Sequence, residues 1–242
     1  MKKLIILSSL LIILLAENTF AGPPFDTDDP EPVNYLHWEF YVSSMMEFEP
    51  GSDNLTLPHF EINYGAFPNT QIHLLAPLGY VKYGRLSNYG YMDTELGFKY
   101  RFINTDNGFM VGIFPLAEIP TGNSSKQLGN GKAQFYVPLW LQKSWGKFTS
   151  YGGVGYWFNP GTGNKNWTFL GWEGQYDFSS YVTLGGEIFY QTPDVQNGQS
   201  VAGFHLGGII NINDHNHVLF SIGHSLNSTD ITSGYLGYQV TI

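Results

Sequence analysis

The chain has no cysteine and few charged residues. Without cysteine it has no disulfide framework, no thiolate metal site and no lipid-modified cysteine anchor. Charged residues make up 13% of its 242 positions, compared with about 25% in a typical soluble domain. The formal net charge of −9 excludes a nucleic-acid partner, because such a partner requires a basic face that neutralises phosphates. Much of the outer surface is therefore predicted to face something other than water.

The N-terminus has the parts of an export signal. A pair of lysines after Met1 is followed by the apolar stretch 4–15 and by small residues before a cut between Ala21 and Gly22. The apolar stretch is too short to span a bilayer, which takes about 20 residues, so an uncleaved anchor is the weaker alternative. We predict a cleaved signal peptide over 1–21.

The segment that follows is rich in proline and acid. Residues 22–34 contain four prolines and four acidic residues, and proline fixes φ and removes amide donors, so neither a helix nor a strand is expected. We predict that 22–36 is an extended leader, inserted in the lumen of a barrel formed by 37–242.

Period-two alternation recurs along the chain from His37 onward. In the clearest run, 93–102, one face is apolar or hydroxylic and the other carries four charges. Such a strand separates an apolar medium from a polar one. Twelve rows of this kind are found, at 38–42, 60–64, 72–78, 93–102, 111–117, 133–141, 148–158, 170–176, 182–190, 204–212, 218–222 and 236–242.

The connections between these rows indicate which medium lies outside. A soluble barrel with an apolar interior would show the same alternation, but short and long connections alternate without exception. The short ones are 67–69, 103–108, 145–147, 178–180 and 213–216, and the longer ones are 45–57, 79–91, 120–131, 159–166, 191–199 and 224–231. Outer-membrane barrels have short periplasmic turns, long extracellular loops and an even strand number. We predict an all-β fold, a single antiparallel transmembrane β-barrel of about 12 strands.

Several segments also resemble a known family. They are AGPPFDTDDPEPVNYLHWEFY at 21–41, MDTELGFKYRF at 92–102, LGNGK at 128–132, PLWLQKSWG at 138–146, TSYGGVGYW at 149–157, TLGGEIF at 183–189 and SIGHS at 221–225. Together they resemble the outer-membrane transporter family labelled "MetA-pathway of phenol degradation". The resemblance implies an outer-membrane barrel with a transport role. It supplies no catalytic or binding residues, and it does not make phenol the substrate.

If the apolar rows face lipid, the ionisable residues between them face the lumen, because a charge on the lipid face costs about 2–4 kcal/mol at the midplane. The predicted lumen-lining residues are Glu39, Glu61, Asp93, Glu95, Lys99, Arg101, Lys132, Glu173 and Glu187. They would form either a water-filled constriction that selects solutes by size and charge or a salt-bridged network that fills a narrow lumen. Twelve strands lie between the filled and the open barrel sizes.

The acidic residues of the leader form a predicted plug. They are Asp26, Asp28, Asp29 and Glu31. Their expected partners are Lys99, Arg101 or Lys132, and the alternative is a loose periplasmic tail. The prolines stiffen the segment and lower the entropic cost of ordering it, which favours the inserted form.

Two other kinds of site receive less support. Barrel enzymes that hydrolyse acyl groups carry a His and a Ser two positions apart on one strand. Here the close pair, His224 and Ser225, is adjacent and so points to opposite faces. His215 and His217 share a face but lie in or beside a turn, which favours a solvated turn over a metal site.

Aromatic residues gather near the predicted strand ends. They are Trp38, Tyr100, Trp140, Trp157, Trp167 and Tyr190. We predict that they form the girdles at the two membrane interfaces. The alternative is that inward members such as Tyr136 and Trp140 line a path for an aromatic solute.

These observations predict a bacterial outer-membrane channel or transporter for the passive passage of small solutes, hydrophobic or aromatic ones included. No enzyme activity, cofactor or metal is expected. The alternative is a structural or surface-receptor barrel with a plugged lumen. The expected partners are outer-membrane lipid and lipopolysaccharide, the barrel-assembly machinery during biogenesis and a small-molecule solute, with no nucleic acid.

Overall fold

The computed structural model describes residues 23–227 and 229–242, so the predicted signal peptide lies outside the described residues. The strands are β1 (Trp38–Glu49), β2 (Ser52–Phe67), β3 (Thr70–Tyr83), β4 (Leu86–Tyr91), β5 (Thr94–Asn104), β6 (Phe109–Ile113), β7 (Leu116–Ile119), β8 (Gln134–Trp145), β9 (Phe148–Phe158), β10 (Trp167–Ser179), β11 (Val182–Gln191), β12 (Val201–Asn213), β13 (Asn216–Ser225) and β14 (Thr232–Thr241). A single 3₁₀ turn, η1 (Ser124–Lys126), lies before β8. No helix in the described ranges is long and apolar enough to cross a membrane.

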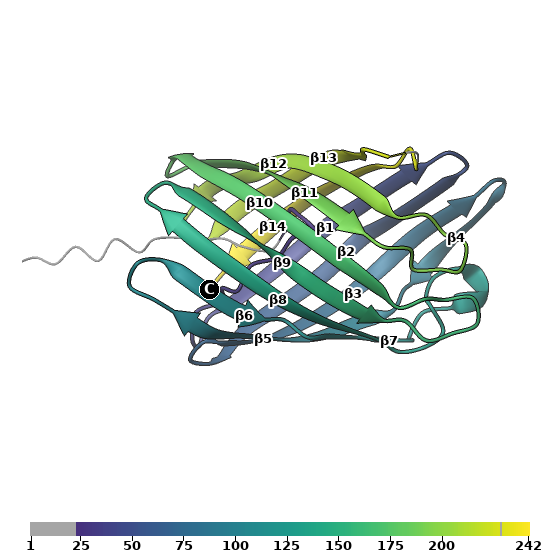
Figure 1. The fold of residues 1–242 in the computed structure, drawn as a ribbon, viewed down its shortest axis with the longest axis horizontal. Helices are drawn as coiled ribbons and strands as arrows, with labels where there is room; N and C mark the ends of the chain where they lie inside the picture. Colours follow the sequence, from purple (N-terminus) through teal and green to yellow (C-terminus); the bar gives the residue numbers. More distant parts are fainter. Residues whose placement is uncertain (1–22, 228) are drawn as a thin grey trace, which may run out of the picture.

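The strands form one sheet that closes on itself. Strand β14 pairs with β1, from Glu39 opposite Thr241 to Phe48 opposite Thr232 (Figure 1). Strands β4 and β5 pair one after the other with β3, and β6 and β7 both pair with β5 and β8. Each of these couples is therefore one interrupted strand, and the fourteen segments form a closed antiparallel barrel of twelve strands, as predicted.

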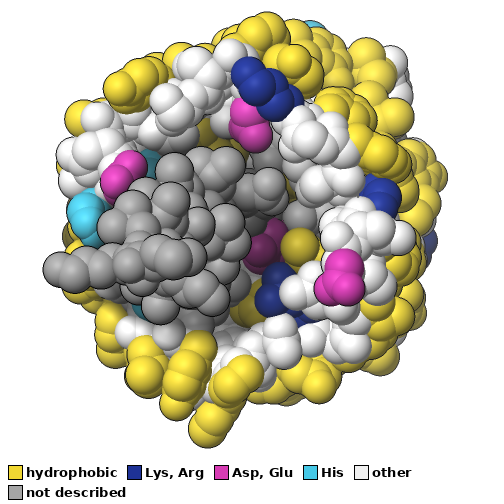
Figure 2. Space-filling view, turned by 90° about the vertical axis from the view of Figure 1, so that its left-hand side faces the viewer, with side chains coloured by type: hydrophobic (Ala, Val, Ile, Leu, Met, Phe, Trp, Pro, Cys, Tyr) yellow, Lys and Arg dark blue, Asp and Glu magenta, His cyan; other side chains and the backbone are white. Residues whose placement is uncertain are grey.

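Successive residues along a strand point alternately outward and inward. On β12, Leu206 and Ile210 are 60% and 43% exposed, whereas the residues that precede them, His205 and Ile209, are 4% and 3% exposed. Hydrophobic side chains surround the barrel, and charged side chains are visible inside the opening when it is viewed end-on (Figure 2). The apolar rows face outward, which is the arrangement of a transmembrane barrel.

Two of the predicted loops, 45–57 and 79–91, are wrong. Both lie largely within long hairpins that are closed by two-residue turns. Strands β1 and β2 have 12 and 16 residues, more than the roughly 9–11 that cross a bilayer, so their ends project beyond the lipid. Asp53 and Lys82 form an ion pair at 2.9 Å across β2 and β3 there. Register shifts between Ser43 and Met46 and between Thr56 and His59 interrupt the alternation, so the strand period is not visible in the sequence.

The predicted aromatic girdle is wrong for three tryptophans. Trp140 is 1% exposed and belongs to an interior cluster, against which Trp157 and Trp167 pack. The alternation along β8 explains the position of Trp140: its neighbours Leu139 and Leu141 point outward, so Trp140 points inward. The other three aromatics of the set are at least 38% exposed: Trp38, Tyr100 and Tyr190.

Candidate functional site

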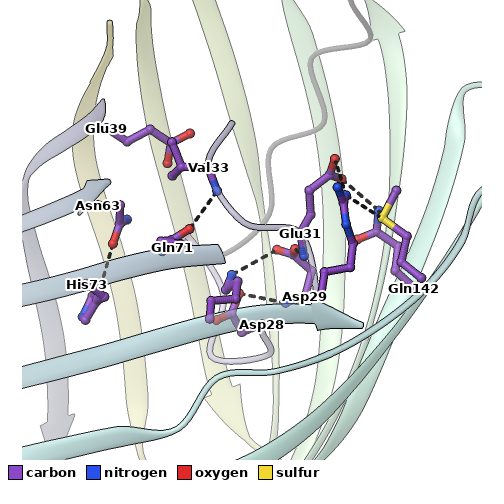
Figure 3. A network of polar contacts seen from close by, with 12 residues as sticks. Asp28, Asp29, Glu31, Val33, Glu39, Asn63, Gln71, His73 and Gln142 are labelled. Carbon is purple, nitrogen blue, oxygen red and sulfur yellow. Dashed lines mark hydrogen bonds and ion pairs between the residues drawn. The ribbon is translucent and has the colours of Figure 1, made fainter. Parts of the chain in front are cut away.

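The leader residues 23–36 lie inside the barrel, against side chains that point inward from the strands (Figure 3). The Lys99 ammonium donates to Asp28 Oδ1 at 2.9 Å and lies 4.0 Å from Asp29 Oδ2. Arg101 Nη1 lies 3.4 Å from Glu31 Oε1. The leader acids thus meet two of their three predicted partners.

The third predicted partner, Lys132, lies in the connection before β8, where it is exposed. Among the ion pairs of the described residues, none involves Lys132. The structure therefore separates Lys132 from the other predicted lumen residues.

The deepest part of the leader is bound by a carboxylate of the barrel wall. The backbone N–H groups of Asp26 and Thr27 donate to the two carboxylate oxygens of Glu187, each at 2.8 Å. The Nδ1 atom of His205 lies 2.7 Å from Glu187 Oε1. One inward carboxylate thus accepts three hydrogen bonds, and charge-assisted bonds of this kind are about twice as strong as neutral ones.

Two inward amides hold the remainder of the leader. The backbone N–H of Val33 donates to Gln71 Oε1 at 2.9 Å, and Gln142 Nε2 donates to Glu31 Oε2 at 3.3 Å (Figure 3). Neither glutamine was among the predicted lumen residues, because the prediction considered charged side chains alone. Parity would have identified both, since each occupies an inward position in its row.

Three inward glycines let the leader approach the wall closely. A Cβ atom at Gly65 would lie 2.0 Å from the carbonyl oxygen of Asn34, and one at Gly171 would lie 2.0 Å from Thr27 Oγ1. A Cβ at Gly112 would lie 3.0 Å from Pro30. Real Cβ contacts are almost never shorter than 3.0 Å. The leader therefore has room at these three positions because the wall residue has no side chain.

The middle of the leader is completely buried. Thr27 and Asp29 are 0% exposed, and Asp29 Oδ1 accepts a hydrogen bond from the backbone N–H of Glu31. Burial raises the pKa of the Asp29 carboxyl well above its ordinary value, while the nearby Lys99 acts in the opposite direction. Docking of the leader is therefore linked to proton uptake by this carboxyl.

Several of the predicted lumen acids accept hydrogen bonds from inward side chains of the same strand or of the next one. Glu61 accepts a hydrogen bond from Asn63 at 2.8 Å, and the His73 ring lies between Asn63 at 2.7 Å and Glu95 at 3.0 Å. Glu39 accepts from the Tyr41 hydroxyl at 2.8 Å. Three of these six residues, Glu39, Glu61 and Glu95, were predicted, and His73 was missed because an isolated histidine gives no sequence signal.

Two further predicted acids have other surroundings. Asp93 lies at the break between β4 and β5, where it accepts from the backbone N–H groups of Gly122 and Asn130 at 2.8 and 2.7 Å. It thereby fixes the connection before β8. Glu173 is 0% exposed, and its carboxylate occupies the space that a Cβ at Gly185 would fill, at 2.4 Å.

A cavity of about 520 Å³ remains beyond the leader. Pro23, Phe25 and Asp28 contribute to one side of it, and the wall includes residues near the β1–β2 and β11–β12 connections, such as Glu47 and Gln191. These connections lie at the end of the barrel opposite the β8–β9 and β10–β11 turns (Figure 1). We call this cavity the vestibule.

A serine, a histidine and a carboxylate lie in one row of the wall. His205 Nε2 lies 2.6 Å from Ser233 Oγ, and its Nδ1 lies 2.7 Å from Glu187. A Cβ at the intervening Gly223 would lie 2.2 Å from the His205 ring, so this glycine makes room for the contact. The search along single strands missed this pair.

This row does not provide the rest of a hydrolase site. The backbone around Ser233 pairs with β1 on one side and with β13 on the other. Its amides are thus engaged in the sheet and do not form an oxyanion hole. Glu187 meanwhile binds the leader, so the row serves to attach the plug segment.

Comparison with known proteins identifies the fold of the chain but not its family. No family model matches the chain, and no curated protein matches it. The COG4313 outer membrane channel from Pseudomonas putida F1 is similar in structure, with a TM-score of 0.71 and 13% identity over 90% of this chain and 100% of that one. The KdgM porin has a TM-score of 0.58 and 13% identity over 83% of this chain and 98% of that one. The fold is that of an outer-membrane β-barrel. The NanC porin shares it as well, with a TM-score of 0.54 and 9% identity over 83% and 98% of the two chains. These likenesses do not test the resemblance to the phenol-degradation family, which stays a prediction.

Proposed function

We propose that the chain is a bacterial outer-membrane channel for passive passage of small solutes, closed at rest by a plug formed by residues 23–36. The predicted signal peptide 1–21 would export it, and the barrel-assembly machinery would insert it among lipid and lipopolysaccharide. The predicted lumen-lining residues would then form the polar wall that a solute meets once the plug is released.

One observation carries this proposal. In its described residues the leader contributes no strand to the barrel, and its backbone pairs with the backbone of the wall in a single isolated bridge, between Tyr35 and Gly65. All twelve strands keep both neighbours without it. The segment can therefore leave the lumen without a loss of strand pairing, which favours a removable plug over a permanent core. The channels and porins among the similar structures support the same function.

The second candidate is a structural or receptor barrel whose lumen never opens. The burial of Thr27 and Asp29 and the three hydrogen bonds to Glu187 favour it, because such a segment is costly to release. The two candidates differ in whether solutes pass through the barrel.

Planar bilayer recordings test this difference. We compare the mature protein with a variant lacking 23–34, and expect the deletion to raise the single-channel conductance, because the lumen then loses the segment that fills it. Liposome swelling with neutral, anionic and aromatic solutes should rise in parallel. Unchanged conductance in a deletion variant that still shows heat-modifiable migration would favour the closed receptor barrel.

A further inference from the structure

We propose that the vestibule binds small organic cations, that is, solutes that carry an ammonium group on a partly apolar frame. This inference rests on the proposed function in assuming that solutes reach the vestibule. It adds a charge class that neither the fold nor the similar structures assign.

The ionic lining of the vestibule has one sign. Six carboxylates contribute to it: Asp26, Asp28, Glu47, Glu61, Glu95 and Asp194. No lysine or arginine is among its lining residues in the part of the chain that the structure describes, and the basic side chains there are three histidines. A surrounding of this kind attracts cations and repels anions.

Partners inside the protein neutralise a minority of these acids. Lys99 pairs with Asp28 at 2.9 Å, and the His73 ring lies 3.5 Å from Glu61 and 3.0 Å from Glu95. Burial and the neighbouring Glu187 also raise the pKa of Asp26 to about 7, so this carboxyl is partly protonated near neutral pH. If protonated His73 balances one of its two carboxylates, Glu47, Asp194 and one of Glu61 and Glu95 remain without a compensating charge. An anionic solute would meet this excess directly.

The remainder of the lining is apolar and aromatic. It includes Leu75, Met92, Phe114 and Phe189. The volume of about 520 Å³ is large enough for a drug-sized solute. A hydrated inorganic ion would leave these apolar surfaces uncovered, whereas a cation with an aromatic or aliphatic body would cover them.

The protein itself binds an ammonium group in the way that we propose for the solute. The Lys99 ammonium lies 4.9 Å from the centroid of the Phe114 ring and 2.9 Å from Asp28, and both of these residues line the vestibule. A carboxylate together with an aromatic face is the usual arrangement for recognition of an ammonium ligand. This pairing at the edge of the cavity shows that its wall accepts a cation of this type.

The test compares three solutes with the same ring and different charge: benzylammonium, benzyl alcohol and benzoate. Their binding to the full mature protein in detergent is measured by calorimetry at low salt. We expect benzylammonium to bind more tightly than benzyl alcohol, and benzoate not to bind. Equal binding of the ammonium and the alcohol, or tighter binding of benzoate, would overturn the proposal.

Variants at the vestibule test whether benzylammonium binds there. Glu47→Gln and Asp194→Asn remove vestibule carboxylates that make no contact with the plug in the described structure. Each should weaken benzylammonium binding about threefold, the effect of a unit charge roughly 7 Å away in water. The matched control is Asp106→Asn, which removes an exposed acid in the β5–β6 turn that does not line the vestibule and should leave binding unchanged. Equal losses in all three variants would mean a general surface effect and would refute the site.

The binding measurement does not require that solutes pass through the barrel. Binding of the cation to a barrel that never conducts would contradict the proposed channel and leave the vestibule site intact. Conductance without charge preference in binding would contradict the vestibule site alone. Heat-modifiable migration on a gel confirms for each variant that the barrel is folded.

Discussion

The substitution Gly65→Ala tests whether the leader is a separable plug. The added Cβ would lie 2.0 Å from Asn34 O and 2.8 Å from Val33 O, both backbone atoms of the leader. The leader must shift by about 1.4 Å to reach an ordinary contact of 3.4 Å. That shift breaks the 2.7 Å hydrogen bond from Leu36 N to Gly65 O. Overpacking of this size costs about 1–3 kcal/mol, which corresponds to a roughly 5- to 150-fold fall in the docked-to-released ratio.

Single-channel recording measures this ratio directly as the frequency of large openings. We expect Gly65→Ala to open more often than the wild type, with the conductance of the open state unchanged. The control is Gly174→Ala, where the added Cβ would lie 3.3 Å from the tip of the flexible Phe148 side chain and far from any leader contact. In the variant lacking 23–34, Gly65→Ala should have no effect. If Gly65→Ala and Gly174→Ala open equally often, the steric reasoning is wrong.

Three further predictions follow from the same contacts. Lys99→Met leaves the leader acids without their buried cation, which costs about 3–5 kcal/mol, so channel openings should become frequent. The exposed control Lys126→Met should behave as wild type, and equal behaviour of the two variants would contradict the role of Lys99. Because burial raises the pKa of Asp29 well above its ordinary value and that of Asp26 to about 7, the docked plug takes up protons and is favoured as pH falls, so openings should increase as pH rises from the ordinary carboxyl range, about 4, to above 7. Asp29→Asn should weaken this dependence, the double change Asp26→Asn and Asp29→Asn should weaken it further, and an opposite slope in the wild type would refute the linkage. Leu206→Arg places a charge midway along the outward face of β12 and should lower the free energy of unfolding in liposomes by about 2–4 kcal/mol. The control Ser200→Arg, in the preceding connection, should change this free energy little. A small loss for Leu206→Arg would mean that this face of β12 does not contact lipid.

The orientation of the side chains was predictable from the sequence because parity alone decides it. Each strand of a closed barrel pairs on both sides, so a residue can face only the lumen or the surroundings. The alternation in 93–102 therefore placed Lys99 and Arg101 inside and Phe98 and Tyr100 outside, as the structure does for all four. The same rule, applied to Trp140, would have corrected the predicted girdle.

The details of the hairpins and of the plug were not predictable in this way. Register shifts in β1 and β2 interrupt the alternation, so no regular period marks the outer parts of these strands. The pairing of Asp28 with Lys99 joins residues 71 positions apart, and nothing in the sequence distinguishes Lys99 from Lys132 as a partner. Only the structure shows that Lys132 lies in an exposed connection, so that Lys99 and not Lys132 pairs with the leader acids.

The glycines and the row of His205 and Ser233 carry no sequence signal. Gly65, Gly112 and Gly171 resemble the other glycines of the barrel until the leader is placed against them. His205 and Ser233 lie on different strands, β12 and β14, and they meet because Gly223 on β13 leaves space between them. Contacts across three strands depend on register, which pattern analysis of a single strand does not provide.

Spin labelling tests the central claim, that the apolar rows contact hydrocarbon while the rows between them face a polar lumen. The chain has no cysteine, so single cysteines placed in turn from Phe204 to Ile210 on β12 give unique labels in reconstituted liposomes. We predict that even-numbered positions are accessible to oxygen dissolved in the lipid and that odd-numbered positions are protected from it. The opposite phase, or no alternation at all, would contradict the account.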